Sequence, residues 1–245
     1  MPEKGGMPRM KYDIVATLCS NNRARSENIN NLKQRFDNVI TIDALDASIH
    51  DNMFPHVINQ YNIPINMLHA RKRNVGFLGC WLSFIFTLKY IYDMYDHDTP
   101  VIMIQDDLVI PEGFNFKQDK WINRGRMYKL SQWDEMYVVD KIVAERFLTT
   151  LYKNPICWDC PDRWIMQHMN PVYLKQLWTH PSQKQLSLLS HTNDGLIKKA
   201  NKPIHKYKWN ITKGFKSSDP GSLLNNKIFR HKKNITSLEN TLKQA

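Results

Sequence analysis

Hydrophobic residues in the first two hundred positions fall into two kinds of segment, short apolar runs and longer stretches with helical spacing. The short runs, which have the length of β-strands, lie at residues 12–18, 39–42, 101–104 and 137–139. The longer stretches, in which apolar side chains return about every 3.6 residues, lie at residues 21–36, 76–92 and 141–152. Strands that alternate with helices in this way predict an α/β fold with a mostly parallel sheet and flanking helices.

Two polar residues refine this prediction. Asp140 stands directly before the third helical segment, where its side chain can accept a hydrogen bond from the first turn, so we expect it to be the N-cap. Lys89 interrupts the most apolar segment, 76–92, which is also shorter than the roughly 20 residues that span a bilayer. We therefore expect that segment to be a helix buried in the core.

The apolar pattern ends near residue 200 and gives way to lysine, asparagine and serine, with Pro203 and Pro220 as further breaks. We therefore divide the chain into an α/β domain over residues 1–197 and a C-terminal segment over residues 198–245. That segment holds 12 lysines and arginines against 2 acidic residues, a net charge of +10 out of the +11 of the whole chain. The domain itself is almost neutral.

A basic segment of this kind is suited to a polyanion, such as nucleic acid, an anionic membrane surface or a phosphorylated substrate. The alternative is a solvated basic surface without a specific partner. The aromatic residues between the lysines can stack on bases or pack the segment onto the domain. The side chains that would contact a polyanion are Lys198, Lys199, Lys206, Lys208, Trp209, Arg230, Lys232 and Lys233.

Composition excludes several classes of protein. With 42% hydrophobic and 23% charged residues among 245, the chain is neither disordered throughout nor collagen-like, and 4 cysteines do not make a disulfide scaffold. The N-terminal residues contain no apolar stretch of the kind found in signal peptides, so we expect a cytoplasmic protein with reduced thiols. Cys157 and Cys160 have the spacing of a metal-binding pair, but a zinc site needs two further ligands, so we expect ordinary thiols.

The sharpest chemical signal is the sequence Gln105-Asp106-Asp107, directly after the apolar run 101–104. Ligands bind at the carboxyl ends of the strands in open α/β sheets. Two carboxylates at the end of a buried strand are costly unless they face a cleft and hold a cation. Mg²⁺ or Mn²⁺ shared with a diphosphate would suit them. The alternative is a turn that ends the strand and caps the next element of the chain.

Taken with the preceding helix, these residues resemble glycosyltransferase family 25, whose members add sugars to lipo-oligosaccharide and to collagen. The family pattern is a helix start with two glycines, a cysteine and a serine, followed by an apolar strand that ends in Glu-Asp-Asp. The residues that match it are Gly76, Gly79, Cys80 and Ser83, followed by Asp106 and Asp107. Weaker similarity lies at residues 13–25, 44–46, 137–144, 161–164 and 180–185. The chain departs from the pattern at Gln105, in place of glutamate, and at Phe84, in place of histidine.

The resemblance implies a GT-A-like fold, one Rossmann-type α/β domain that binds a nucleotide sugar, with a UDP-sugar as the expected donor, together with Mn²⁺ or Mg²⁺. It implies that Asp107 binds the metal and that Asp106 meets the sugar or ribose. Arg23 and Arg25 would lie beside the phosphates, which suit guanidinium groups, or would alternatively be solvated at the start of a helix. The further donor contacts implied are Gly79, Ser83 and Gln185. Ser83 can equally cap or pack its helix.

Two further roles have more than one candidate. An inverting reaction needs a general base for the acceptor hydroxyl, for which Asp162 is the first candidate and Asp159 the second. Each can instead be a loop carboxylate paired with Arg163. In the resembled fold a third metal ligand is often a late histidine, so His180 and His191 are candidates, and either can also be a bystander.

Three functions fit these expectations. The first is a metal-dependent glycosyltransferase that modifies a hydroxymethylated base in DNA, as phage and viral enzymes do, with the base flipped into the site. The second is the same chemistry on a saccharide or lipo-oligosaccharide acceptor at the inner membrane surface. The third is a nucleic-acid-binding protein without catalytic activity. Scattered lysines and two prolines in residues 198–245, without an amphipathic pattern, favour DNA over a membrane-bound acceptor.

Overall fold

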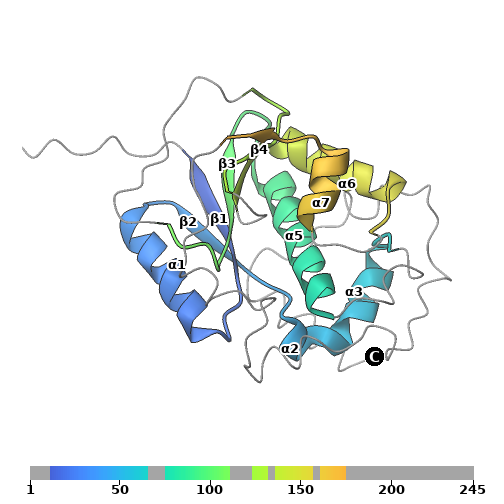
Figure 1. Ribbon diagram of the computed structural model, residues 1–245, viewed down its shortest axis with the longest axis horizontal. Coiled ribbons are helices and arrows are strands. Elements are labelled where there is room, and N and C mark those ends of the chain that lie inside the picture. Colours follow the sequence, from blue (N-terminus) through green and yellow to red (C-terminus); the bar gives the residue numbers. More distant parts are fainter. Residues whose placement is uncertain (1–11, 66–74, 111–122, 132–135, 157–160, 175–245) are drawn as a thin grey trace, which may run out of the picture.

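The computed structural model describes residues 12–65, 75–110, 123–131, 136–156 and 161–174. Within them lies one six-stranded sheet with helices on both faces (Figure 1). The strands are β1 (Asp13–Leu18), β2 (Val39–Asp43), β3 (Val101–Gln105), β4 (Tyr128–Lys129), β5 (Met136–Val139) and β6 (Val172–Tyr173). The helices are α1 (Arg23–Arg35), α2 (Ala47–His50), the 3-10 helix η1 (Asp51–Met53), α3 (Phe54–Gln60), α5 (Val75–Met94), α6 (Lys141–Lys153) and α7 (Pro161–His168).

The strand order is β2-β1-β3-β5-β4-β6. β1 pairs in parallel with both β2 and β3, β5 is antiparallel to its neighbours β3 and β4, and β4 and β6 are parallel. Among the described strands only β5 therefore runs against the others. The structure confirms an α/β fold with a mostly parallel sheet and flanking helices. It adds that the apolar run at 137–139 belongs to the reversed strand.

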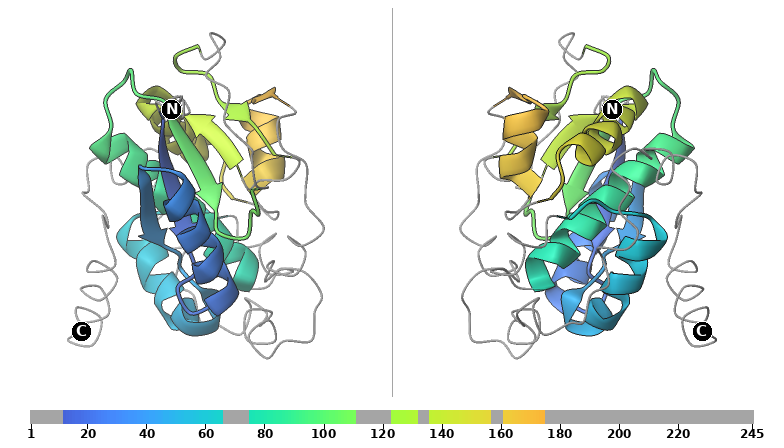
Figure 2. Two further views of the ribbon diagram at one scale, coloured as in Figure 1. Left: turned by 90° about the vertical axis from the view of Figure 1, so that its left-hand side faces the viewer. Right: turned by 90° about the vertical axis from the view of Figure 1, so that its right-hand side faces the viewer.

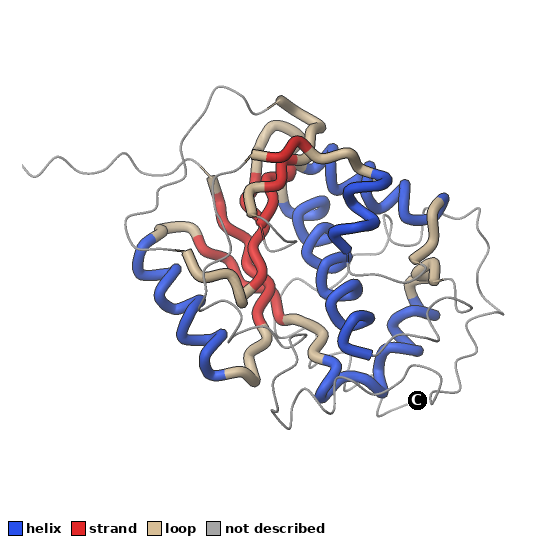
Figure 3. The backbone as a smooth tube through the Cα atoms, viewed as in Figure 1, coloured by secondary structure: helices blue, strands red, loops and turns tan. Residues whose placement is uncertain are grey.

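The central strands are buried on both faces, as their unbroken apolar sequence predicts. Along β1, Ile14 packs with Ile29 and Leu32 of α1, whereas Val15 packs with the residues of α5 and α6 on the other face. Ile14 and Val15 are both fully buried. Figures 2 and 3 show the sheet between α1 on one side and α5 with α6 and α7 on the other.

The long helix α5 is the core of the larger layer. Among the described residues it alone is long and apolar enough to cross a membrane, but 78% of its most apolar window is buried inside the molecule. Its charged residue Lys89 is fully buried and forms an ion pair with Asp93 one turn later. The Lys89 ammonium also lies 5.3 Å from the ring centre of Tyr92. The structure thus confirms the buried helix expected over residues 76–92.

The predicted cap of α6 is confirmed. Asp140 Oδ1 accepts a hydrogen bond of 2.7 Å from the Val143 amide in the first turn. The other oxygen accepts one of 2.6 Å from the amide of Gly125, whose φ is +67°. A side chain at Gly125 would strain this left-handed backbone. Asp140 therefore joins the start of α6 to the segment that leads into β4.

Candidate functional site

The candidate ligand site lies at the carboxyl end of the sheet, between β1 and β3. The chain leaves β1 through α1 toward β2 on one side, whereas β3 pairs with β1 on the other. This reversal of strand order is the place where ligands bind in open α/β sheets. The predicted Asp pair lies there, in the middle of a β-turn closed by a 3.1 Å bond from the Leu108 amide to the Gln105 carbonyl. The position of the Asp pair therefore agrees with a cation site, and its place in a turn agrees with a role in ending the strand.

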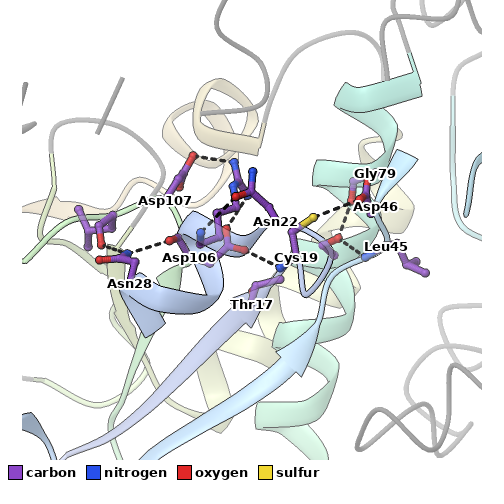
Figure 4. A network of polar contacts seen from close by, with 12 residues as sticks. Thr17, Cys19, Asn22, Asn28, Leu45, Asp46, Gly79, Asp106 and Asp107 are labelled. Carbon is purple, nitrogen blue, oxygen red and sulfur yellow. Dashed lines mark hydrogen bonds and ion pairs between the residues drawn. The ribbon is translucent and has the colours of Figure 1, made fainter. Parts of the chain in front are cut away.

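Asp106 anchors this turn to the end of β1. Its side chain is buried, and its Oδ2 accepts a 2.5 Å hydrogen bond from the Cys19 amide. Its Oδ1 accepts a 2.5 Å bond from Arg25 Nη1. Figure 4 shows Asp106 between Cys19 and Asn28. The pKa of Asp106 is raised to about 6. Burial raises this pKa most, the charge of Arg25 lowers it, and the charge of Asp107 raises it. Both oxygens thus bind protein groups, and contact between Asp106 and a donor stays a prediction.

Arg25 bridges the two carboxylates unequally. Its Nη2 lies 3.4 Å from Asp107 Oδ2, a longer contact than the one to Asp106. Burial opposes the charge of Arg25, but Asp106 and Asp107 together more than offset this and raise its pKa. Among the residues described, the buried Oδ1 of Asp107 has no hydrogen-bond partner. Among the described side chains of the turn, one guanidinium thus faces two carboxylates.

A polar face of α1 holds the same turn. Asn22 begins the helix by accepting a 3.2 Å bond from the Arg25 amide. Asn28 Nδ2 donates to the carbonyls of Asp106 and Leu108, both at 2.8 Å. Arg35 Nη1 donates to the Ile110 carbonyl at 2.7 Å. The sequence analysis missed Asn28 and Arg35, because the polar face of an amphipathic helix usually faces solvent.

The predicted donor contacts Gly79 and Ser83 pack α5 against the segment after β2. The hydroxyl of Ser83 donates to the Gly79 carbonyl at 2.7 Å and accepts from the Leu45 amide at 2.8 Å. A Cβ on Gly79 would lie 2.6 Å from the Leu45 carbonyl oxygen. The same segment also contacts the end of β1, where the thiol of Cys19 donates to Asp46 Oδ2 at 3.2 Å. These contacts match the packing role allowed for Ser83, and donor contact by either residue stays a prediction.

Arg23 does not join the Asp pair. Its side chain is 93% exposed and forms an i,i+4 ion pair of 2.7 Å with Glu27 on the surface of α1. Of the two predicted phosphate-binding arginines, the structure therefore brings only Arg25 to the turn after β3.

The candidate base Asp162 lies in the first turn of α7 beside a buried lysine. Lys129 Nζ, on β4, lies 3.9 Å from Asp162 Oδ2 and 5.8 Å from the ring centre of Tyr137. The Lys129 side chain is only 4% exposed. Lys129 pairs with Tyr137, which pairs with Met103 in the middle of β3, so this ion pair lies two strands from β3, at the level of its central residue. Sequence analysis missed Lys129 because a two-residue strand has no readable period.

The remaining predicted residues lie outside the described part of the chain. They are Asp159, Gln185, His180, His191 and the basic-segment residues Lys198, Lys199, Lys206, Lys208, Trp209, Arg230, Lys232 and Lys233. Within the described part, no group of three or more His, Cys, Asp or Glu side chains is arranged to hold a metal ion. At this edge, the buried Oδ1 of Asp107 is a carboxylate oxygen without a hydrogen-bond partner among the described residues.

No family model, curated protein or solved structure matches the chain. A function for the site therefore rests on its own residues, by their geometry and by the resemblance of their sequence pattern.

Proposed function

We propose that this protein is a metal-dependent glycosyltransferase with a GT-A-like domain, which transfers a sugar from a nucleoside diphosphate sugar to an acceptor hydroxyl. The observation that carries the proposal is the arrangement where the strand order reverses: the buried Oδ1 of Asp107 has no partner among the described residues, and its Oδ2 lies 3.4 Å from Arg25. A carboxylate and a guanidinium side by side suit a cation and a diphosphate respectively. The resemblance to glycosyltransferase family 25 supports the same chemistry.

The residues present fit a divalent cation shared with the donor. Mg²⁺ sites for phosphate substrates use one or two carboxylates and leave the other positions to water and phosphate oxygens. Asp107 would supply that carboxylate, and His180 or His191 would add a ligand from outside the described residues. When bound, the cation, Mn²⁺ or Mg²⁺, neutralises charge on the departing diphosphate. Arg25 would orient that diphosphate, and Asp106 would hold Arg25 in place.

Asp162 is the proposed general base. It would take the proton of the acceptor hydroxyl as the oxygen attacks the anomeric carbon and the bond to the diphosphate breaks. Two features support this role. Asp162 lies in the first turn of a helix, where the backbone favours a negative charge, and Lys129 faces it at 3.9 Å. Both features stabilise the anionic carboxylate, which is the form in which Asp162 could accept a proton.

We propose DNA with hydroxymethylated bases as the acceptor. The net charge of +10 over residues 198–245 supports a polyanionic partner, and a reactive base would have to be flipped out of the duplex. This assignment fits a protein acting in the cytoplasm, of a host cell if the protein is viral. A saccharide or lipo-oligosaccharide acceptor at an anionic membrane is the alternative that the same chemistry allows.

A mass measurement on the DNA tests the proposal. The full-length protein is incubated with Mn²⁺, one nucleotide sugar at a time, and duplex DNA that contains hydroxymethylated pyrimidines, after which the nucleosides are weighed. We expect a nucleoside heavier by one sugar residue. The adduct should be absent with unmodified DNA, with EDTA and with Asp107→Ala.

Two other results would change the assignment. Release of nucleoside diphosphate without a DNA adduct would keep the transferase and move the acceptor to a saccharide or lipid. Neither adduct nor release with any donor would overturn the transferase and leave the DNA-binding protein as the remaining hypothesis, to be checked by DNA affinity in the same samples.

A further inference from the structure

We propose that Asn28 is a positioning residue, which fixes the turn that carries Asp107 and thereby sets the affinity of the site for its cation. This inference rests on the proposed function, because it concerns the metal-binding carboxylate of the same site. The observation behind it is a juxtaposition: one side-chain amide of α1 binds the backbone on both sides of Asp107.

The geometry of this contact uses both donors of one amide. A carboxamide nitrogen has two N–H donors. Asn28 Nδ2 makes two hydrogen bonds of 2.8 Å, one to the carbonyl of Asp106 and one to the carbonyl of Leu108. The two acceptors flank Asp107 in the chain, within the turn that Leu108 closes onto Gln105. Asn28 therefore fixes the peptide group before Asp107 and the one after Leu108, while the peptide between them is held by the bond from the Leu108 amide to Gln105, and this restrains the direction of the Asp107 side chain.

Asp107 depends on this support more than Asp106 does. The carboxylate of Asp106 is held by the Cys19 amide and by Arg25, both at 2.5 Å. The carboxylate of Asp107 has one contact among the described residues, at 3.4 Å from Arg25, and its buried Oδ1 has none. Because the Asp107 carboxylate has so few contacts of its own, its orientation depends mainly on the backbone conformation that Asn28 stabilises.

Asparagine is the residue type that this position needs. Aspartate has the same shape but no donor at neutral pH, and its oxygens would face the two carbonyls. Leucine has the same number and branching of side-chain heavy atoms, with bulkier methyl groups, and neither donor. Arg35 binds the Ile110 carbonyl, two residues beyond Leu108, so it does not replace the bonds on either side of Asp107. Substitution of Asn28 therefore frees the turn while the packing of α1 on the sheet, through Ile29 and Leu32, remains.

The test measures metal binding and not turnover. The full-length protein is titrated with Mn²⁺ in the presence of UDP, and in separate titrations with the other common nucleoside diphosphates, while free Mn²⁺ is followed by its electron paramagnetic resonance signal. Because second-layer partners of metal ligands typically change metal affinity by about 10- to 100-fold, we expect Asn28→Leu and Asn28→Asp to weaken Mn²⁺ binding by that factor. The matched controls are Asn31→Leu and Asn31→Asp, since Asn31 is exposed on the same helix.

The outcomes are distinct. All titrations are made well below the unfolding midpoint of each variant, which circular dichroism supplies. If an Asn28 variant is less stable but binds Mn²⁺ as the wild type does, Asn28 is only structural and the inference is overturned. If Asn28→Leu does not fold, the isosteric Asn28→Asp decides in the same way. If the wild type binds no Mn²⁺ with any nucleoside diphosphate, the proposed function itself fails and the inference fails with it.

Discussion

The guanidinium of Arg25 lies 2.5 Å from the carboxylate of Asp106 in an ion pair almost closed to solvent, with side chains 11% and 3% exposed. A buried ion pair of this kind is costly to break from one side, because the remaining charge stays desolvated. Asp107, the next residue, takes part only through a 3.4 Å contact. The two neighbouring carboxylates should therefore respond very differently to substitution.

Asp106→Ala should destabilise the fold, whereas Asp107→Ala should remove function. The first leaves the Cys19 amide and Arg25 without their buried acceptor, so we expect a loss of about 2 kcal/mol or more in the free energy of unfolding. The second loses only the longer contact, and its stability should stay within about 1 kcal/mol of the wild type. Urea unfolding and Mn²⁺-dependent release of nucleoside diphosphate measure the two effects. Equal stability of both variants would contradict the roles assigned.

Asp106 should also give the fold a characteristic pH dependence. Its pKa is raised from 3.8 to about 6 by burial, so between these values the folded state holds a proton that the unfolded state has lost. The stability that this group contributes is complete below about pH 4 and declines by about 1.4 kcal/mol for each pH unit up to about pH 6. Urea unfolding of wild type and Asp106→Ala across pH 4 to 7 isolates the effect by difference. A stability difference that does not change with pH would argue against a buried titrating carboxyl.

Asp162→Asn should lower the rate of sugar transfer without weakening donor binding. A general base typically contributes a factor of about 10² to 10⁴ in rate. The matched control is Asp96→Asn, which removes a carboxylate that is exposed in the loop after α5. Lys129→Met should lower the rate by a smaller factor, because it removes the cation that faces Asp162 but leaves the carboxylate. Single-turnover transfer and the KM for the donor separate the two contributions, and an active Asp162→Asn would move the base to Asp159.

Gly79→Ala and Ser83→Ala should affect stability first. A methyl group on Gly79 would meet the Leu45 carbonyl at 2.6 Å, and overpacking of this kind costs about 1 to 3 kcal/mol. Removal of the Ser83 hydroxyl leaves the buried Leu45 amide unsatisfied, at a similar cost. In protein that remains folded, the KM for the donor should be unchanged. A raised KM with normal thermal unfolding would instead support the donor contacts that the resemblance implies.

The basic C-terminal segment should determine how DNA binding depends on salt. Replacement of Lys232 and Lys233 with glutamine should weaken binding uniformly across DNA sequences and reduce the slope of log affinity against log salt by roughly one for each phosphate that is no longer neutralised. The matched control replaces Lys33 and Lys153, which are exposed at the ends of α1 and α6. Fluorescence anisotropy of labelled duplex DNA measures both. Equal slopes for the two double variants would exclude a specific role for the segment.

Much of the fold followed from periodicity, because long segments with a clear period depend little on distant residues. The strands β1, β2 and β3, the helices α1, α5 and α6, and the cap at Asp140 all formed where expected. The direction of β5 could not be read, since an apolar run looks the same in a parallel and in an antiparallel strand. β4 and β6 have two residues each, too few for any pattern.

The candidate site was predictable in position but not in its contacts. The Asp pair after a buried strand identified the turn, because two carboxylates at such a place are costly unless they are paired or hold a cation. The partners of that turn were not readable, since Arg25 and Asn28 lie on a helix whose polar face gives no sign of what it covers. Arg23 and Arg25 look equivalent in sequence, and only the three-dimensional register of α1 separates the exposed residue from the buried one.

The contacts that hold the turn after β3 also constrain how the protein folds. Asp106 binds Cys19 and Arg25, which precede it by 87 and 81 residues, and Asn28 precedes it by 78. Contacts between such distant residues form late, because a long loop must close before they are made. During synthesis β1 and α1 emerge well before β3, so the Arg25 side chain is solvated until Asp106 and Asp107 have been synthesised. The turn after β3 and the pairing of β1 with β3 therefore depend on the same long-range closure of the chain.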